Sequence, residues 1–427
     1  MDTRTLRLID RWVGLPLCVG LTWHRRLFRR DEKAGDLRRI LFIKLAEQGS
    51  TVLTAAAFDE AIRRVGRQNV LFLAFEENRF ILDAMGVLPR ENVLTIDARS
   101  LLATVRSGLA VLRRLRALRV GATIGLEFFA RSSAILAYLS GARCRVGLHS
   151  HAGEGPYCGD LLTHRLVHNP YLHTADLFKM MVQAIDHPPD RFPAFDLQCT
   201  PEALARGAAG GAVAWHAFTP READVGAVRA MLRNAFAADP LPRLVLLNAN
   251  CSDLLPLRRW AADRYVALAA RLLAARPDAG IVLTGAPNEA AEVEALARRI
   301  TAAFPHSGPP RCVSLAGRTT LSQLLALYSI AEVLVTNDSG PAHFATLTPI
   351  DIVTLFGPET PALFAARTPR NHVLWAGTAC SPCVNAFNNR LSACRNNVCM
   401  QLLSVDHVAD AALAAYDARC ASPARAS

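Results

Sequence analysis

The chain has 427 residues, of which 51% are hydrophobic and 20% are charged, and its formal net charge is +11. This length predicts two α/β domains, each large enough to bury its own core, and no internal repeat of about 20–50 residues indicates a repeat protein. The basic residues are almost all arginines, and since RNP, zinc-finger and helix-turn-helix signatures are missing, we expect no nucleic-acid partner.

An apolar run, Trp12–Trp23, marks the N-terminal segment, residues 1–36. The run is shorter than the roughly 20 apolar residues that cross a bilayer, and it lacks the small-residue cleavage site of a signal peptide. Arginines flank it on both sides, at Arg7, Arg11, Arg25, Arg26, Arg29 and Arg30. Two interpretations remain open: the segment rests in the interface of an anionic membrane surface, or it forms a helix packed on the N-terminal domain.

The N-terminal domain is expected over residues 37–205, where short apolar runs alternate with longer amphipathic ones. This alternation predicts strands separated by helices, which build βαβ units and a parallel sheet. The predicted strands are Ile40–Lys44, Val70–Phe75, Val93–Ile96, Ala122–Glu127 and Arg145–Leu148, and the predicted helices are Thr51–Val65 and Leu101–Leu118. Residues 150–240 are less regular because glycines and prolines interrupt the pattern.

The alternation restarts in the C-terminal domain, expected over residues 206–400, and a last helix falls in the C-terminal region 401–427. The predicted strands are Leu244–Asn248, Ile281–Thr284, Cys312–Leu315, Val333–Thr336 and Ile352–Phe356, and the predicted helices are Trp260–Ala275, Glu289–Ala303, Leu321–Tyr328 and Val405–Tyr416. Two doubly wound domains in series are the simplest interpretation. In such sheets ligands bind beyond the carboxyl ends of the strands.

The loop after the fourth predicted strand of this domain, Asn337–His343, carries the richest pattern. Asp338 or Ser339 is expected to cap the following helix. The backbone N–H groups of Ser339 and Gly340, together with the helix dipole, would form an anion site, to which His343 adds a donor. Asp338 would repel a phosphate, so we expect it to accept hydrogen bonds from sugar hydroxyls or to order the turn. An ordinary capped helix is the alternative interpretation.

Two further loops of the C-terminal domain carry polar side chains. Ser252 ends the stretch Asn248–Ser252, and Arg258 lies at the start of the next helix, a combination that suits diphosphate binding. Glu289 lies one short loop past a strand and could accept hydrogen bonds from ribose hydroxyls. The ordinary alternatives are a solvated helix start for Arg258 and a first-turn carboxylate for Glu289.

The first loop of the N-terminal domain runs from Lys44 to Ser50, from a strand end to a helix start. Ser50 is the expected N-cap of that helix. Glu47 is the only carboxylate in the loop and therefore the candidate general base. Lys44, Gly49 and Ser50 are expected on the side of the acceptor, the substrate from which such a base would remove a proton. An exposed loop glutamate is the alternative interpretation of Glu47.

Several common signatures are missing. The sequence has no Asp-x-Asp pair to hold a divalent metal on a nucleotide diphosphate, no Gly-x-x-x-x-Gly-Lys-Ser/Thr loop and no Gly-x-Ser-x-Gly elbow. We therefore expect a reaction that requires no metal and no cofactor. Arg258 and the helix N-terminus after Thr336 would stabilise the leaving group.

Together these loops resemble the heptosyltransferase group of glycosyltransferases, family 9, from about Ile40 to Met400. The most specific match is Asn337–His343, and further matches are Ala345, Pro349, Phe356-Gly-Pro358, Arg258-Arg-Trp260, Leu283-Thr-Gly285 with Glu289, and Leu315-Ala-Gly317. The resemblance implies the α/β GT-B fold, two Rossmann-like domains facing a central cleft. It also implies an inverting transfer of a sugar, typically heptose from ADP-heptose, to a lipopolysaccharide-type or other envelope glycan.

The resemblance also assigns roles to residues and a place in the cell. The N-terminal domain would take the acceptor, and the donor contacts would be Ser252, Arg258, Glu289, Asp338, Ser339, Gly340 and His343. A lipid-linked acceptor implies a cytoplasmic enzyme, peripheral at the inner face of the inner membrane.

One departure from the family concerns the catalytic base. The family usually places an aspartate directly after the glycine of the first loop, whereas here Ser50 follows Gly49. A hydroxyl is a poor base near neutral pH, so Glu47 is the preferred replacement, with His149 or His151 as others. The departure leaves two alternatives open: a non-catalytic nucleotide-sugar-binding subunit of a polysaccharide assembly complex, and a nucleotide-sugar epimerase of similar fold.

Four cysteines gather before the last helix, at Cys380, Cys383, Cys394 and Cys399. Four thiolates can close a tetrahedral zinc site, but these spacings match no common zinc module. A structural zinc ion is therefore one interpretation, and structural cysteines, reduced or disulfide-linked, are the other.

Overall fold

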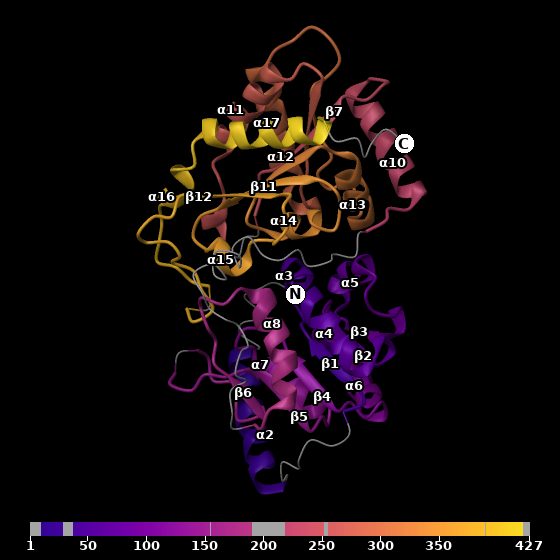
Figure 1. Ribbon diagram of the computed structural model, residues 1–427, viewed down its shortest axis with the longest axis vertical. Helices are drawn as coiled ribbons and strands as arrows, with labels where there is room; N and C mark the ends of the chain where they lie inside the picture. Colours follow the sequence, from indigo (N-terminus) through magenta and orange to yellow (C-terminus); the bar gives the residue numbers. More distant parts are fainter. Residues whose placement is uncertain are drawn as a thin grey trace. The chain divides into compact units, whose positions relative to one another are not determined.

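The computed structural model describes residues 10–28, 37–153, 155–189, 218–251, 255–388 and 390–421 (Figure 1). The chain forms two compact units: unit 1 comprises Met1–Ala205 and Asn385–Leu391, and unit 2 comprises Arg206–Val384 and Ser392–Ser427. Asn385–Leu391 thus belongs to the N-terminal unit, although it was expected in the C-terminal domain. The region 401–427 is likewise part of unit 2 instead of a separate appendage.

Unit 1 is built on a six-stranded parallel sheet with the order β3-β2-β1-β4-β5-β6. Its strands are β1 Ile40–Ile43, β2 Val70–Phe75, β3 Val93–Ile96, β4 Ala122–Gly125, β5 Cys144–Leu148 and β6 His164–Leu166. The first five were predicted from the sequence. β6 was not, because three residues are too few to show a periodic pattern.

The helices of unit 1 include one that the sequence analysis misplaced. They are α2 Leu15–Phe28, α3 Gln48–Val52, α4 Ala55–Val65, α5 Arg79–Met85, α6 Leu101–Ala117, α7 Arg131–Leu139 and α8 Thr174–Gln183, with a π-helical turn at Asp10–Gly14 before α2. The single helix expected over Thr51–Val65 is interrupted after Val52. Ser50 is not its N-cap but lies inside α3, which begins after Glu47.

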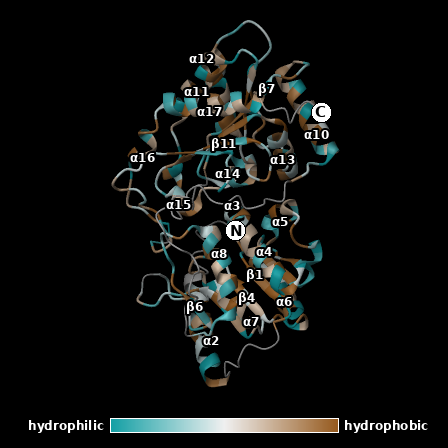
Figure 2. Cartoon of the chain, viewed as in Figure 1, coloured by the Kyte–Doolittle hydropathy of each residue, from teal (hydrophilic) through white to brown (hydrophobic). Residues whose placement is uncertain are grey.

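Successive strand residues of unit 1 point to opposite faces of the sheet, and each face has its own helices. On one face the rings of Phe42, Phe58 and Phe72 pack together, with centroids 5.2–6.4 Å apart, and Phe58 belongs to α4. On the other face Leu41 shares a core cluster with Val111 of α6 and with residues of α7. In Figure 2 hydrophobic residues gather around the central strands of this sheet.

Unit 2 repeats this plan with the strand order β12-β11-β10-β7-β8-β9, again parallel throughout. Its strands are β7 Arg243–Asn248, β8 Ala279–Leu283, β9 Cys312–Ser314, β10 Val333–Asn337, β11 Asp351–Phe356 and β12 Asn371–Trp375. Five were predicted, and β12 is additional. Two parallel sheets with helices confirm the predicted α/β class.

The helices of unit 2 are α10 Glu222–Phe236, α11 Ala262–Ala275, α12 Ala290–Ala303, α13 Leu321–Ile330, α14 Gly340–Ala345, α15 Pro361–Phe364, α16 Val398–Gln401 and α17 Val405–Ala421. The predicted last helix is present as α17, drawn in yellow in Figure 1. Its buried side chains belong to the same core cluster as those of β10 and β11, which is why this region is part of unit 2. In the described part of the chain, no helix has both the length and the apolarity that a bilayer crossing requires.

The aromatic cluster yields a stability prediction. Phe58 is fully buried, so Phe58→Ala leaves a cavity beneath α4 and should lower the free energy of unfolding of unit 1 by about 3–5 kcal/mol. Urea unfolding measures the free energy of unfolding, and hydrogen exchange of the backbone amides of β1 and β2 assigns the change to unit 1. Leu402→Ala, at an exposed position directly after α16, is the control and should change stability by less than about 0.5 kcal/mol. A Phe58→Ala protein with wild-type stability would contradict the packing described here.

Candidate functional site

The loop after β1 carries the candidate base in a strained conformation. Glu47 has φ 63° and ψ 73°, the left-handed region that a residue with a Cβ rarely occupies. Such a conformation costs on the order of 1 kcal/mol and persists only where the surroundings impose it. Strained residues of this kind cluster at functional sites, and Glu47 is therefore a position of interest on backbone grounds alone.

The side chain of Glu47 is surrounded by hydrogen-bond donors. Ser50 Oγ donates to Glu47 Oε2 at 3.1 Å, and Lys44 Nζ, fully buried, lies 3.5 Å from the same oxygen. Arg390 donates to both carboxylate oxygens, one of them at 3.3 Å. Nearby cations favour the ionised form of a carboxylate, which is the form that a general base needs.

A second carboxylate holds this loop in place. Glu127 lies shortly after β4, and its Oε1 accepts the backbone N–H groups of Leu45 at 2.7 Å and Ala46 at 3.0 Å. The amide of Asn78 donates to the carbonyl of Leu45 from the next loop along the sheet edge. Sequence reasoning included Glu127 only as a strand end. Its place beyond the carboxyl end of a parallel strand was the signal that could have drawn attention to it.

Arg390 comes from the segment Asn385–Leu391, which is distant in sequence from the rest of unit 1. Phe387 anchors this segment, with its ring 5.0 Å from that of His168 and 6.1 Å from that of Phe129. Nothing in the local sequence connects Glu47 with an arginine 343 positions away. The other candidate bases, His149 and His151, stack edge-to-face on each other after β5 at 4.9 Å.

In unit 2 the buried side chain of Asn337 joins the ends of two neighbouring strands. Its Nδ2 donates to the carbonyls of Ala249 at 2.9 Å and Asn250 at 3.3 Å, both directly after β7. Its Oδ1 accepts the backbone N–H of Trp260 at 3.1 Å and the hydroxyl of Tyr265 at 3.4 Å. All polar atoms of the amide are thus used to hold the segment that carries Arg258 against the end of β10.

Arg258 lies between two buried carboxylates. Its Nη1 donates to the carbonyl of Asp338 at 3.1 Å, its Nε lies 3.4 Å from Asp338 Oδ2, and its Nη2 donates to Glu359. The structure therefore brings together the loops after β7, β10 and β11. Asp338 and Arg258 were candidates from the sequence, whereas Glu359, shortly after β11, was missed.

The helix that follows Asp338, α14, is short, and its start differs from the expectation. Neither Asp338 nor Ser339 caps it with a side chain: the Ser339 hydroxyl donates to the carbonyl of Asn337 at 3.1 Å, and the Asp338 carboxylate faces Arg258. The first N–H groups of a helix have no intrahelical acceptor, so the amides of Ser339 and Gly340 remain the candidate anion donors. His343 lies in α14 and is buried.

The remaining candidates of unit 2 are less informative. Glu289 Oε2 accepts the backbone N–H of Ala286 at 2.7 Å, so its carboxylate caps its own turn, as the ordinary interpretation had it. Arg259 pairs with Glu292 at 3.0 Å at a more exposed position. Ser252 lies outside the described residues. The donor-binding role of these residues stays a prediction.

The four cysteines do not form a metal site in the structure. No group of three or more His, Cys, Asp or Glu side chains among the described residues could hold a metal ion, and none of the four cysteines forms a disulfide bond in the structure. Cys383 Sγ accepts from Ser392 at 3.3 Å, and Cys394 Sγ donates to the carbonyl of Asn396 at 3.2 Å. Burial, and then the charges of the three other thiols, raise the pKa of the Cys399 thiol. In the described part of the chain the sulfur atoms face separate partners, and the zinc interpretation stays a prediction.

The role of Asn337 can be measured as stability. Asn337→Ala removes four hydrogen bonds and leaves a buried N–H and two buried carbonyls without their partner, so unit 2 should lose about 2–4 kcal/mol. Urea unfolding measures the loss. Asn396→Ala, at an exposed asparagine of the same unit, should cost less than about 0.5 kcal/mol. Equal effects of the two substitutions would show that Asn337 does not hold the loops together.

His168 makes the stability of unit 1 dependent on pH. Burial lowers its pKa from 6.5 to about 4, so the folded chain favours the neutral ring. The unfolded chain takes up a proton below pH 6.5 and the folded chain only near pH 4, so stability falls as the pH falls through this window. From pH 7 to about pH 4.5 the loss should be about 2–3 kcal/mol.

His168→Phe keeps an aromatic ring against Phe387 but cannot take up the proton. Urea unfolding at both pH values should show a smaller loss of stability for this variant than for the wild type. Burial also lowers the pKa of His164, and this contribution is present in both proteins and cancels in the comparison. Parallel stability–pH curves for the two proteins would rule out His168 as the source.

Comparisons with known proteins bear on what these loops do. The family described as glycosyltransferase family 9 (heptosyltransferase) matches residues 110–392. The lipopolysaccharide heptosyltransferase 2 of Escherichia coli is 36% identical over 108 residues, which are 25% of this chain and 29% of that protein. The lipooligosaccharide heptosyltransferase 2 of Haemophilus influenzae is 32% identical over 106 residues, again 25% and 29%. The chain therefore matches less than a third of the length of these curated relatives.

Solved structures agree over a longer stretch. The E. coli ADP-heptose lipopolysaccharide heptosyltransferase II has a TM-score of 0.65 at 17% identity, covering 90% of this chain and 100% of that one. A family 9 glycosyl transferase from Veillonella parvula has a TM-score of 0.63 at 17% identity, covering 91% and 100%. Identities this low show the fold alone, and they confirm the expected GT-B class. Because the family match extends over well more than half of its residues, the chain belongs to glycosyltransferase family 9.

Proposed function

We propose that this chain transfers a heptose from ADP-heptose to a lipopolysaccharide-type acceptor, with inversion and without a metal ion. Family membership and the local match to lipopolysaccharide heptosyltransferase 2 support the reaction class. The observation that carries the proposal is the position of the Glu47 carboxylate, which accepts the Ser50 hydroxyl at 3.1 Å. It therefore lies beside the position after Gly49, where the family has its aspartate base.

In unit 1 the proposed chemistry is proton removal. Glu47 accepts the proton of the acceptor hydroxyl while that oxygen forms a bond to the anomeric carbon of the donor sugar. The bond from this carbon to the phosphate oxygen breaks, its electron pair leaves with the nucleotide diphosphate, and the configuration inverts. Lys44 and Arg390 pair with the carboxylate and fix its position before the transfer, and a positioned base of this kind contributes about 10²–10⁴-fold to a rate.

In unit 2 we propose that the loops after β7, β10 and β11 bind the donor. The carboxylates of Asp338 and Glu359 are suited to accept hydrogen bonds from sugar or ribose hydroxyls, with Arg258 setting their orientation. The backbone N–H groups of Ser339 and Gly340 would donate to the diphosphate. Arg258 would share its donors between the carboxylates and the leaving group, since a guanidinium has five N–H bonds.

One observation favours a second candidate, a nucleotide-sugar-binding subunit without catalytic activity. Ser50 replaces the family aspartate. The nearby carboxylate of Glu47 pairs with Lys44 and Arg390, and these contacts compete with an acceptor hydroxyl for its oxygens. In this case unit 2 would still bind the nucleotide sugar. We propose that in either case the protein acts on the cytoplasmic side of the inner membrane, where a lipid-linked acceptor is made.

The test separates the charge of Glu47 from its ion pair. Glu47→Gln should lower turnover by about 10²–10⁴-fold and leave the affinity for ADP-heptose within about twofold, because the donor binds in unit 2. Arg390→Gln breaks the same ion pair but keeps the carboxylate, and should lower turnover by less than about tenfold. Glu76→Gln, in the exposed loop after β2, is the matched control and should be neutral. Turnover is measured with ADP-heptose and UDP-sugars, and affinity by calorimetry.

The outcomes divide the two candidates. Unchanged turnover in Glu47→Gln would exclude Glu47 as the base. Nucleotide binding without turnover by the wild type, across donors and heptose-deficient lipopolysaccharide acceptors, would indicate a binding subunit. No binding of any nucleotide diphosphate would remove both candidates.

A further inference from the structure

The N-terminal helix α2 is fastened to unit 1 along one face. Cys18 and Thr22 are buried, and Thr22 Oγ1 accepts the backbone N–H of Asp160 at 2.9 Å. Arg25 pairs with the Asp160 carboxylate at 2.9 Å. Gly159 allows this close approach, since a Cβ there would lie 2.9 Å from Thr22 Oγ1. Of the two interpretations open from the sequence, packing on the N-terminal domain is therefore observed, and the membrane interpretation depends on the opposite face.

The opposite face of α2 is apolar and exposed. Trp23, Leu27 and Phe28 are 61%, 67% and 76% exposed, and Leu17 and Val19 of α2 are exposed as well. Trp12 and Val13, in the π-helical turn before α2, are also exposed. A helix on the surface of a water-soluble domain normally places polar residues on its outer side. Large exposed apolar patches mark surfaces that contact a protein or a membrane. The outer face of α2 would therefore be more stable in contact with an apolar environment than in water.

A second helix on the same side of the sheet also carries exposed apolar residues. α6 and α7 both pack on the sheet face that carries Leu41, since Leu115 and Ala137 belong to the same core cluster, and α2 packs against α7 (Figure 1). The outer positions of α6 are apolar too: Leu101, Leu102, Val105 and Leu109 are exposed. Exposed arginines lie among them, at Arg106, Arg113 and Arg114. We call the outer faces of α2 and α6 the α2/α6 surface.

We propose that the α2/α6 surface docks unit 1 on an anionic lipid bilayer. Trp, Leu and Phe side chains enter the interface between headgroups and acyl chains, and arginines beside them are attracted to anionic headgroups. Arg26 on α2 and the arginines of α6 supply that charge. An apolar protein partner or a second copy of this chain would not account for arginines interleaved with the apolar residues. The inference goes beyond the proposed function, since it holds whatever sugar is transferred.

The test uses the full chain and vesicles of two compositions. The wild type should co-sediment with vesicles of phosphatidylcholine containing phosphatidylglycerol, and only weakly with phosphatidylcholine alone. The triple variant Trp23→Ser, Leu27→Ser, Phe28→Ser should bind the anionic vesicles at least about tenfold more weakly. Arg106→Gln and Arg113→Gln should each lower binding by about fivefold and reduce its salt dependence.

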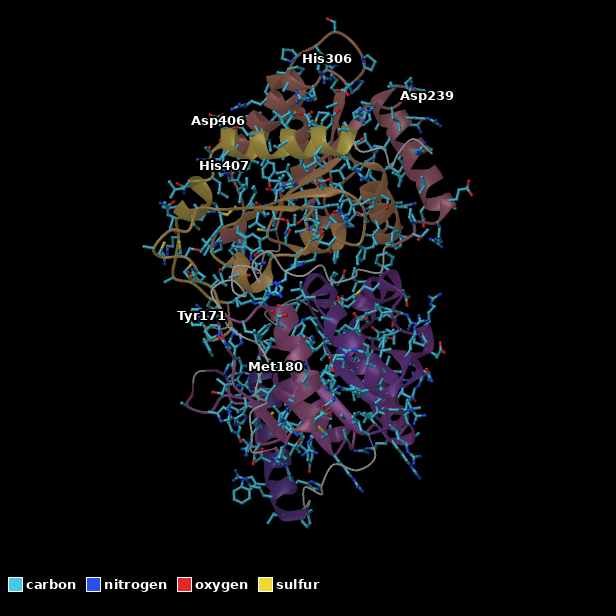
Figure 3. All side chains as sticks on the ribbon, viewed as in Figure 1. Tyr171, Met180, Asp239, His306, Asp406 and His407 are labelled. Carbon is cyan, nitrogen blue, oxygen red and sulfur yellow. The ribbon has the colours of Figure 1, made fainter. Side chains whose placement is uncertain are left out.

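A matched control variant also replaces exposed apolar side chains by serine, but at positions outside the α2/α6 surface. Tyr171, labelled in Figure 3, and Leu402 are 87% and 60% exposed outside α2 and α6, so Tyr171→Ser with Leu402→Ser should leave vesicle binding unchanged. Equal binding by the triple variant and the wild type would overturn the proposal. A second result would also overturn it: the wild type binds no vesicles and is a dimer in light scattering, whereas the triple variant is a monomer.

Nucleotide binding and transfer to a soluble acceptor fragment are measured on the same proteins. Wild type that binds vesicles but transfers no sugar refutes the proposed function and leaves the docking surface intact. Wild type that transfers sugar but binds no anionic vesicle refutes the docking surface alone. The triple variant should transfer to the soluble fragment at the wild-type rate, because none of its positions lies in the loops beyond the strand ends.

Discussion

The amide of Asn337 is the contact on which the candidate site of unit 2 depends. It is buried at the end of β10 and bonds to two carbonyls after β7 and to the N–H of Trp260. A buried amide without partners is costly, so these bonds restrict the loop after β7 to one path. That path places Arg258 beside Asp338 and Glu359, and Glu127 performs the corresponding task for the loop of Glu47 in unit 1.

The charges in the two units suggest different kinds of recognition. In unit 2 a single guanidinium lies between two buried carboxylates, so the cluster formally carries one negative charge. Such a cluster favours neutral partners with hydroxyl donors, and a diphosphate must rely on backbone N–H groups nearby. In unit 1 the sign of the charge is reversed, because the single carboxylate of Glu47 lies beside two cations, Lys44 and Arg390. Under the proposed function, unit 2 therefore binds hydroxyl groups and unit 1 removes the proton.

The segment Asn385–Leu391 connects Glu47, the proposed base, with the cysteine-bearing region of the sequence. It leaves unit 2 after Val384, supplies Phe387 and Arg390 to unit 1, and returns at Ser392. The ring of His168 against which Phe387 packs is held neutral by burial. The environment of Glu47 therefore depends on an apolar contact made by residues far away in the sequence, and the cysteine-bearing region has a structural role through this segment.

The sequence by itself determined the class of fold, the ten strands whose apolar runs are long enough to show a pattern, and the loops where polar residues follow them, since these are local properties of the chain. It missed the strands β6 and β12 and the helices α5, α7, α8 and α10, and it placed a helix N-cap at Ser50. β6 and α5 are too short to show a clear period, and α8 and α10 lie in the region where glycines and prolines interrupt the pattern. Only the tertiary structure decided which side chains meet. Arg390 and Glu127 complete the candidate site of unit 1, and Glu359 completes that of unit 2. No local pattern encodes these contacts, because each exists only after the sheet of its unit has formed.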